Sequence, residues 1–124
     1  MNEMEVIKIR RDNYYRINSS YGGGNEEFLD LMKSEWNRYL TFVNEWDTFA
    51  ISAEEMARVG FFLYHPLRLI VKCAFCRGEI SDLKEGMDPH FVHAYNLPLC
   101  PFIMLDEVGN QPIDVTPINR DFYC

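Results

Sequence analysis

Four residues whose side chains bind soft metal ions lie close together in the sequence: Cys73, Cys76, His93 and Cys100. The Cys73-x2-Cys76 spacing places two thiols on a tight turn, from which both sulfurs can reach one tetrahedral zinc ion. His93 and Cys100 are seven positions apart, so a histidine near the end of a helix and a cysteine just beyond it can reach the same ion. On spacing alone His90 stays an alternative ligand, because residues three apart share part of a helical face.

A set of three cysteines and one histidine predicts one structural Zn²⁺. Thiolate and imidazole ligands suit this ion, and four protein ligands leave no open position for a substrate. Binding of zinc to such a site contributes on the order of 10 kcal/mol to folding, judged from zinc-finger peptides. We therefore interpret the chain as a zinc-stabilised domain and not as an enzyme.

Three other uses of the cysteines fit the sequence less well. A thioredoxin-like redox pair starts a helix, whereas the residues after Cys76 predict a turn and a strand. A disulfide needs an oxidising compartment, and the charged N-terminus has no signal-peptide pattern. A nucleophile at Cys73 or Cys100 with a histidine base is compatible with the spacing and stays open, although two further cysteines beside it favour a metal.

The composition excludes some classes of partner. The 124 residues, 48% of them hydrophobic, suffice for one domain with its own core.

The formal net charge of −7 opposes unspecific attraction to phosphate, so no nucleic-acid partner is expected. No stretch approaches the roughly 18 apolar residues of a membrane span, so no membrane partner is expected. We expect a protein of the reducing cytoplasm.

The chain divides into three zones. Residues 1–24 are polar, lack clear periodicity and end in a run of glycines, which predicts an N-terminal tail or linker. Folding of these residues across the domain, or pairing with a second chain, stays open. Residues 25–105 contain the patterned segments and predict the zinc domain. Residues 106–124 have little periodicity and predict an extended C-terminal tail.

The central zone mixes helical and strand patterns. Its first segment predicts one amphipathic helix, because apolar residues recur three and four apart at Phe28, Met32, Trp36, Tyr39, Leu40 and Val43. We expect Trp36 and Trp46 to lie in the core.

Three further elements follow in the sequence. Ser52 has capping-box spacing to an acid, so it opens a short helix that ends at Gly60. Residues 61–73 predict a strand, a turn and a strand, and residues 79–83 predict a third strand. Asp88 followed by proline opens a helix that carries the histidine ligand.

The residues around the metal ligands resemble the baculoviral inhibitor-of-apoptosis repeat, or BIR domain. Cys73-x2-Cys76-x16-His93-x6-Cys100 is similar to the full ligand spacing of that family, which favours His93 over His90. Other family motifs are matched by "RYLTF" at 38–42, "ARVGFF" at 57–62, "DP" at 88–89 and "LPLCPFI" at 97–103. The resemblance covers about residues 35–105.

The resemblance implies a small α+β fold, in which a three-stranded antiparallel sheet and four or five short helices surround one zinc ion. It also implies a protein-interaction module that regulates cell death. Expected partners are caspases, antagonists of inhibitor-of-apoptosis proteins, other such inhibitors and signalling adaptors. In many members a groove beside the third strand accepts an Ala-initiated peptide by strand addition, and an acid there pairs with the peptide amine.

The corresponding groove of this chain departs from the family pattern. It comprises Glu79, Ile80, Ser81, Asp82, Leu83, Met87 and Asn96. Glu79 stands where the family keeps a glycine, and Leu83 where it keeps a tryptophan. Met87 replaces the acid that pairs with the amine, and Asn96 replaces an aromatic residue. These changes predict a degenerate groove, in which a neighbouring acid such as Asp82 could supply residual affinity.

The pattern resembles the first, or type I, repeat of viral and insect inhibitors. In those proteins a second repeat and a RING ubiquitin ligase would lie downstream. We therefore interpret the 124 residues as an N-terminal fragment, with a complete single-repeat viral protein as the alternative and homo-oligomerisation left open.

Overall fold

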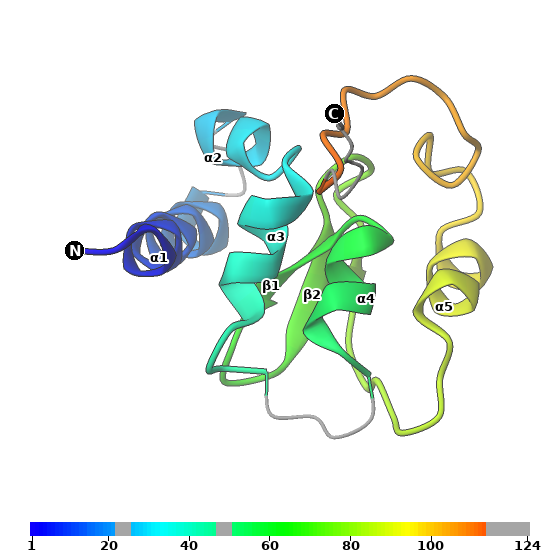
Figure 1. Cartoon of the computed structure of the whole chain (residues 1–124), viewed down its shortest axis with the longest axis horizontal. Coiled ribbons are helices and arrows are strands. Elements are labelled where there is room, and N and C mark those ends of the chain that lie inside the picture. Colours follow the sequence, from blue (N-terminus) through cyan, green and yellow to red (C-terminus); the bar gives the residue numbers. More distant parts are fainter. Residues whose placement is uncertain (22–25, 47–50, 114–124) are drawn as a thin grey trace, which may run out of the picture.

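The structure, a computed structural model, describes residues 1–21, 26–46 and 51–113. These residues form a three-stranded antiparallel sheet with helices around it, as the family resemblance implied (Figure 1). The strands, in sheet order, are β1 (Phe61–His65), β2 (Ile70–Cys73) and β3 (Glu79–Ile80). The helices are α1 (Glu3–Tyr21), α2 (Glu26–Leu31), α3 (Glu35–Phe42), α4 (Ala53–Arg58) and α5 (Pro89–Asn96).

The sheet is buried on both faces, which explains why residues 61–73 do not alternate between apolar and polar side chains. Leu63 pairs with Val71, which pairs with Ile80 on the next strand, and all three enter one core. We call it the zinc-face core; it contains Phe42, Ile51, Met56, Phe61, Leu63, Val71, Cys73, Ile80, Val92 and Cys100. The opposite, helix-face core contains Ile7, Tyr14, Phe28, Leu29, Met32, Leu40, Phe62, Tyr64 and Ala74.

Helix α1 contributes to the helix-face core and packs against α3 and β1. Its most buried side chains, Ile7, Arg11 and Tyr14, recur at spacings of four and three. The Tyr14 ring stacks on Phe28 with 5.0 Å between the ring centroids. The prediction of a tail or linker is therefore wrong for Glu3–Tyr21, because the helical stripe contains an arginine that hydrophobic periodicity does not count. The glycines at 22–24 lie outside the described residues.

Arg11 is only 2% exposed and connects α1 to the end of α3. Its guanidinium donates to the Thr41 carbonyl at 3.1 Å and pairs with the Glu45 carboxylate at 3.1 Å. Lys8 pairs with the other oxygen of the same carboxylate at 3.3 Å. A buried arginine requires such partners, because an unpaired charge away from water is costly.

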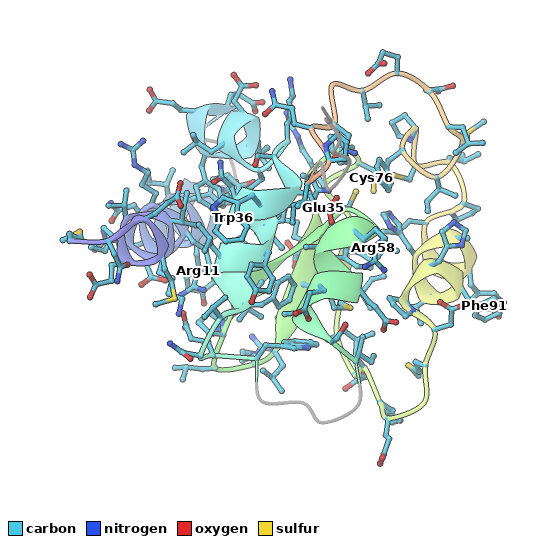
Figure 2. All side chains as sticks on the ribbon, viewed as in Figure 1. Arg11, Glu35, Trp36, Arg58, Cys76 and Phe91 are labelled. Carbon is cyan, nitrogen blue, oxygen red and sulfur yellow. The ribbon has the colours of Figure 1, made fainter. Side chains whose placement is uncertain are left out.

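The predicted single helix is divided into α2 and α3. Ser34 begins α3 by accepting a hydrogen bond from the Asn37 amide, which satisfies a free N–H of the first turn. The division turns Trp36 outward. This side chain is 44% exposed and donates to Glu3 of α1, so its prediction as a core residue is wrong (Figure 2). Trp46, by contrast, packs against the zinc-face core.

The segment after α5 runs over the domain and returns to α3 (Figure 1). Gln111 forms a parallel bridge with Ser34, and Asn110 accepts a hydrogen bond of 2.9 Å from Arg38. Arg38 is fully buried and also donates to the Ala57 carbonyl at 2.9 Å. Apart from the bridge at Gln111, residues 106–113 form no helix or strand, and residues 114–124 lie outside the described chain. Among the described helices none has the length and apolar character needed to cross a membrane.

Candidate functional site

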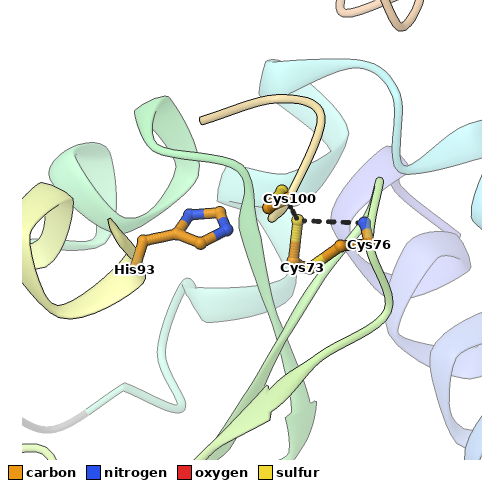
Figure 3. A group of neighbouring side chains, drawn as sticks. All are labelled: Cys73, Cys76, His93 and Cys100. Atoms are coloured by element: carbon orange, nitrogen blue, oxygen red, sulfur yellow. Dashed lines mark hydrogen bonds between the residues drawn. The ribbon is translucent and has the colours of Figure 1, made fainter. Parts of the chain in front are cut away.

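The structure brings the four predicted metal ligands together (Figure 3). Cys73 ends β2, Cys76 lies in the following turn, His93 is on α5, and Cys100 follows that helix. Their ligand atoms all lie within 4.8 Å of one another. The Asp88 cap and Pro89 begin α5 as predicted, and this start places His93 on the buried side of the helix.

The sulfur geometry suits a tetrahedral metal ion. The Sγ atoms of Cys73 and Cys100 are 3.7 Å apart, and a tetrahedron with metal–sulfur bonds of about 2.3 Å has edges of about 3.8 Å. Backbone amides of the turn point at the sulfurs, since Cys76 N donates to Cys73 Sγ and Gly78 N donates to Cys76 Sγ, both at 3.4 Å. These N–H groups stabilise thiolate charge and fix the ligand positions.

The imidazole of His93 is held with one nitrogen free for a metal. Its Nδ1 donates to the Val59 carbonyl at 2.7 Å, which leaves the lone pair on Nε2. Nε2 is buried and has no hydrogen-bond partner among the described residues. A buried polar atom without a partner is costly, and a metal ion would satisfy it. Phe61 stacks on the ring with 4.4 Å between centroids.

The ionisation of these groups also fits metal binding. Burial lowers the pKa of His93 below its usual value of 6.5, so the ring is neutral at pH 7. Hydrogen bonding from the Cys73 thiol lowers the pKa of Cys76 to about 5. The same hydrogen bond and burial raise the pKa of Cys73, because the pair shares one negative charge. Metal ligands must be thiolates and neutral imidazoles, and a cation would deprotonate the remaining thiols.

These residues fit one zinc ion, with Cys73, Cys76, His93 and Cys100 as its ligands. Spacing alone had left His90 open as an alternative ligand. In the structure His90 is exposed and lies outside the cluster, so it is not one of the ligands. The sequence did not indicate two supporting features, the Val59 carbonyl and the space beside Gly60. A Cβ atom at Gly60 would lie 3.4 Å from the His93 ring and 3.3 Å from Phe102, and Gly60 has φ +100°.

The predicted groove residues occupy two separate places. Glu79 lies on the helix-face side of β3, where its carboxylate pairs with Lys72 at 3.6 Å. Ile80 enters the zinc-face core, and Leu83 packs against it. Ser81 and Asp82 are exposed; Asp82 has φ 59°, which ends the strand after two residues of the predicted five.

Met87 and Asn96 instead line a cavity of about 530 Å³ along α5. Phe91 and Tyr95 also line it, and their rings stack on each other with 5.7 Å between centroids. Residues 79–83 are not part of its lining. We call it the α5 cavity; the role of the predicted groove residues in binding stays a prediction.

Comparison with known proteins agrees with this architecture. The family model of the inhibitor of apoptosis domain, BIR, matches residues 38–104. An apoptosis inhibitor IAP of Cydia pomonella granulosis virus is 40% identical over 72 residues, which are 58% of this chain and 26% of that protein. The E3 ubiquitin-protein ligase IAP-3 of Orgyia pseudotsugata multicapsid polyhedrosis virus is 36% identical over 98 residues, 79% of this chain and 35% of that protein.

Solved structures are similar as well. The crystal structure of DIAP1 BIR1 bound to a Grim peptide has a TM-score of 0.62 and 26% identity, and covers 75% of this chain and 94% of that one. The autoinhibited dIAP1-BIR1 domain has a TM-score of 0.63 and 27% identity, and covers 72% and 90%. The chain thus spans about a third or less of the viral relatives but nearly all of these domain structures. It belongs to the BIR family of inhibitor of apoptosis domains.

Proposed function

We propose that the chain is a zinc-stabilised protein-interaction module that regulates cell death by binding proteins of the apoptosis pathway. The observation that carries this proposal is the family match over residues 38–104, which includes all four zinc ligands. The viral relatives are named as an apoptosis inhibitor and an E3 ubiquitin ligase. Because the chain spans only part of them, a ligase activity would belong to a longer protein, in the cytoplasm of the host cell if that protein is viral.

A protein partner has two accessible features to bind. Strand β3 is at the edge of the sheet, so its free backbone groups are open to strand addition. The α5 cavity lies nearby in sequence and presents aromatic surface, with Phe91 62% exposed and Tyr95 74% exposed. An unpaired strand edge and exposed apolar surface are each typical of sites that bind other proteins.

We further propose that affinity for Ala-initiated peptides is lost or much weakened. The left-handed Asp82 leaves only Glu79–Ile80 for strand addition. In the α5 cavity Met87 and Asn96 offer no charge to a peptide amine. The one carboxylate in the lining, that of Asp88, already accepts a hydrogen bond of 3.1 Å from the His90 amide as the cap of α5.

Calorimetric titration with an Ala-initiated tetrapeptide tests this weakening. No saturable binding below about 100 μM is expected for the native chain. The double variant Met87→Glu/Asn96→Trp restores an acid and an aromatic wall, so it should bind at least about tenfold more tightly. The N-acetylated peptide is the matched control, because it has no amine. Micromolar or tighter binding by the native chain would contradict the proposal.

A second candidate is direct binding of a caspase or an antagonist through a residual groove. It is favoured by the similarity to DIAP1 BIR1, which was solved with a Grim peptide bound. The same titration separates the candidates, since a residual groove predicts binding that Asp82→Asn weakens. A cysteine-dependent enzyme is the remaining alternative. It predicts that Cys73 or Cys100 is alkylated in the native zinc-loaded chain, whereas a structural site protects both and leaves only Cys124 to react.

The interaction role itself is tested by partner capture. The zinc-loaded chain, immobilised in insect cell extract, should retain proteins of the apoptosis pathway, identified by mass spectrometry. As a control, the same immobilised chain is unfolded by removing its zinc with a chelator. This unfolded chain should retain none of these proteins. If the folded chain captures no such protein from apoptotic or resting cells, the proposed role is wrong.

A further inference from the structure

A second cavity, of about 680 Å³, lies away from β3. Its walls come from the end of α4, the start of α5 and the segment 102–112. Figure 2 shows Arg58 on the side of α4 that faces α5. Asp88 is the only residue that this cavity shares with the α5 cavity. We call it the α4–α5 cavity.

The segment that closes the α4–α5 cavity is anchored at both ends. At one end Phe102 stacks on Phe75, with 5.0 Å between centroids and an interplanar angle of 7°. At the other end Asn110 accepts a hydrogen bond from the buried Arg38. Between them the Asp106 amide donates to the Pro101 carbonyl at 2.9 Å. The cavity is therefore formed before any partner binds, which lowers the entropy lost on binding.

The lining combines an apolar floor with a negatively charged rim. Side chains of Val59, Phe102, Ile103 and Val108 provide apolar surface. The rim carries four carboxylates, from Glu55, Asp88, Asp106 and Glu107, and one guanidinium, from Arg58. Within the described residues none of these five groups forms an ion pair. The rim thus has an excess of negative charge that the domain itself does not neutralise.

We propose that the α4–α5 cavity is a docking site for a protein segment that carries arginine or lysine beside apolar residues. Such a side chain has an apolar stem and a cationic head. The stem would pack on the floor while the head pairs with rim carboxylates, so both parts of the lining are used. An acidic segment would be repelled by the rim. The proposal rests on the proposed interaction role and assigns it a second surface, distinct from β3.

A capped peptide tests the site without involving the β3 groove. The probe is acetyl-Leu-Arg-Leu-Arg-Leu-amide, titrated into the ¹⁵N-labelled, zinc-loaded full chain and followed by NMR. Because the acetyl group removes the free amine, recognition of an Ala-type N-terminus cannot contribute. Saturable shifts are expected at residues 58–59, 88–90 and 102–108. The matched peptide with glutamate in place of arginine should cause none.

Two double variants separate local contact from overall charge. Asp106→Asn/Glu107→Gln removes two rim charges and keeps an oxygen for the hydrogen bond from the Gly109 amide; it should weaken binding at least about fivefold. The control Glu5→Gln/Glu85→Gln changes the net charge equally at two exposed positions outside the cavity lining, and it should weaken peptide binding less than about twofold. Arg58→Gln removes the one repelling charge and should strengthen binding.

Several results would overturn the proposal. These are the absence of saturable binding, shifts confined to residues 79–83, or equal weakening in the two double variants. Rim shifts that grow with protein concentration before peptide is added would assign the cavity to a second copy and also overturn it. A chain that captures apoptosis proteins but fails this titration refutes only the docking site, whereas failure of both experiments refutes the interaction role.

Discussion

The two faces of the sheet are stabilised in different ways. On the zinc face, four ligands from β2, the following turn, α5 and the segment beyond it meet at one point. On the opposite face, α1 is held by packing of Tyr14 and by the ion pair of Arg11 with Glu45. One face depends on a single ion, whereas the other depends on a mixed polar and apolar surface. The comparison indicates that α1 is part of the folded domain.

The largest expected effect is loss of a zinc ligand. Cys76→Ser should abolish zinc binding and unfold the domain, because zinc supplies on the order of 10 kcal/mol of folding energy. Metal content by atomic emission and far-UV circular dichroism would measure both changes. The exposed His90 provides the control, since His90→Ala should retain one zinc per chain. A folded, monomeric Cys76→Ser protein would show that the ion is dispensable.

The second effect tests the helix face. Tyr14→Ala should destabilise the domain by about 3 kcal/mol, because Tyr14 is buried between α1, α2 and β1. Chemical denaturation in excess zinc would measure the free energy of unfolding. The zinc content should stay at one ion, which separates the two faces.

Ile9, which is 46% exposed on the same helix, offers a matched control, and Ile9→Ala should change stability by less than about 1 kcal/mol. If Tyr14→Ala behaves like Ile9→Ala, α1 is not an integral part of the domain.

The third effect concerns the shape of the zinc face. Gly60→Ala should destabilise the domain by about 2 kcal/mol. The new side chain would have a strained φ of +100° and its Cβ would contact Phe102 and the His93 ring. Gly86→Ala is the control: its φ is +86°, but no atom lies within 4 Å of the added Cβ. Gly86→Ala should lower the free energy of unfolding by only about 1 kcal/mol. Equal losses in thermal denaturation would mean that the close approach to His93 is unimportant.

The smallest effect is a difference in pH dependence between the faces. Burial raises the pKa of Tyr14 from 10.0 to about 12, so the folded state keeps the phenol protonated. This stabilisation is fully present below pH 10 and is lost as the pH rises toward 12. The total loss of stability is at most about 2 kcal/mol. Denaturation of the native chain and Tyr14→Phe between pH 8 and 11 should show a steeper loss in the native chain. Parallel curves would exclude Tyr14 as the cause.

Much of the zinc face could be predicted from the sequence. The ligand set, the Asp88 cap with Pro89 and the left-handed Gly60 each depend on local spacing and backbone conformation, and each agrees with the structure. The helix face was less predictable because its evidence is distributed over distant residues. The Arg11 position becomes a core position only when Thr41 and Glu45 approach it from α3 and the turn after that helix. Trp36, similarly, loses its core position once Ser34 divides the helix.

By itself, the sequence determined the three cysteine ligands and the family that the zinc motif resembles, and that resemblance favoured His93 over His90. These conclusions follow from residue types at fixed spacings. The tertiary structure alone decided that α1 covers the second face of the sheet. It also decided that Glu79 and Met87 lie in different places and that four acids surround an apolar cavity. The physical reason is that burial and charge balance are set by groups from distant segments, and periodicity within one segment does not contain them.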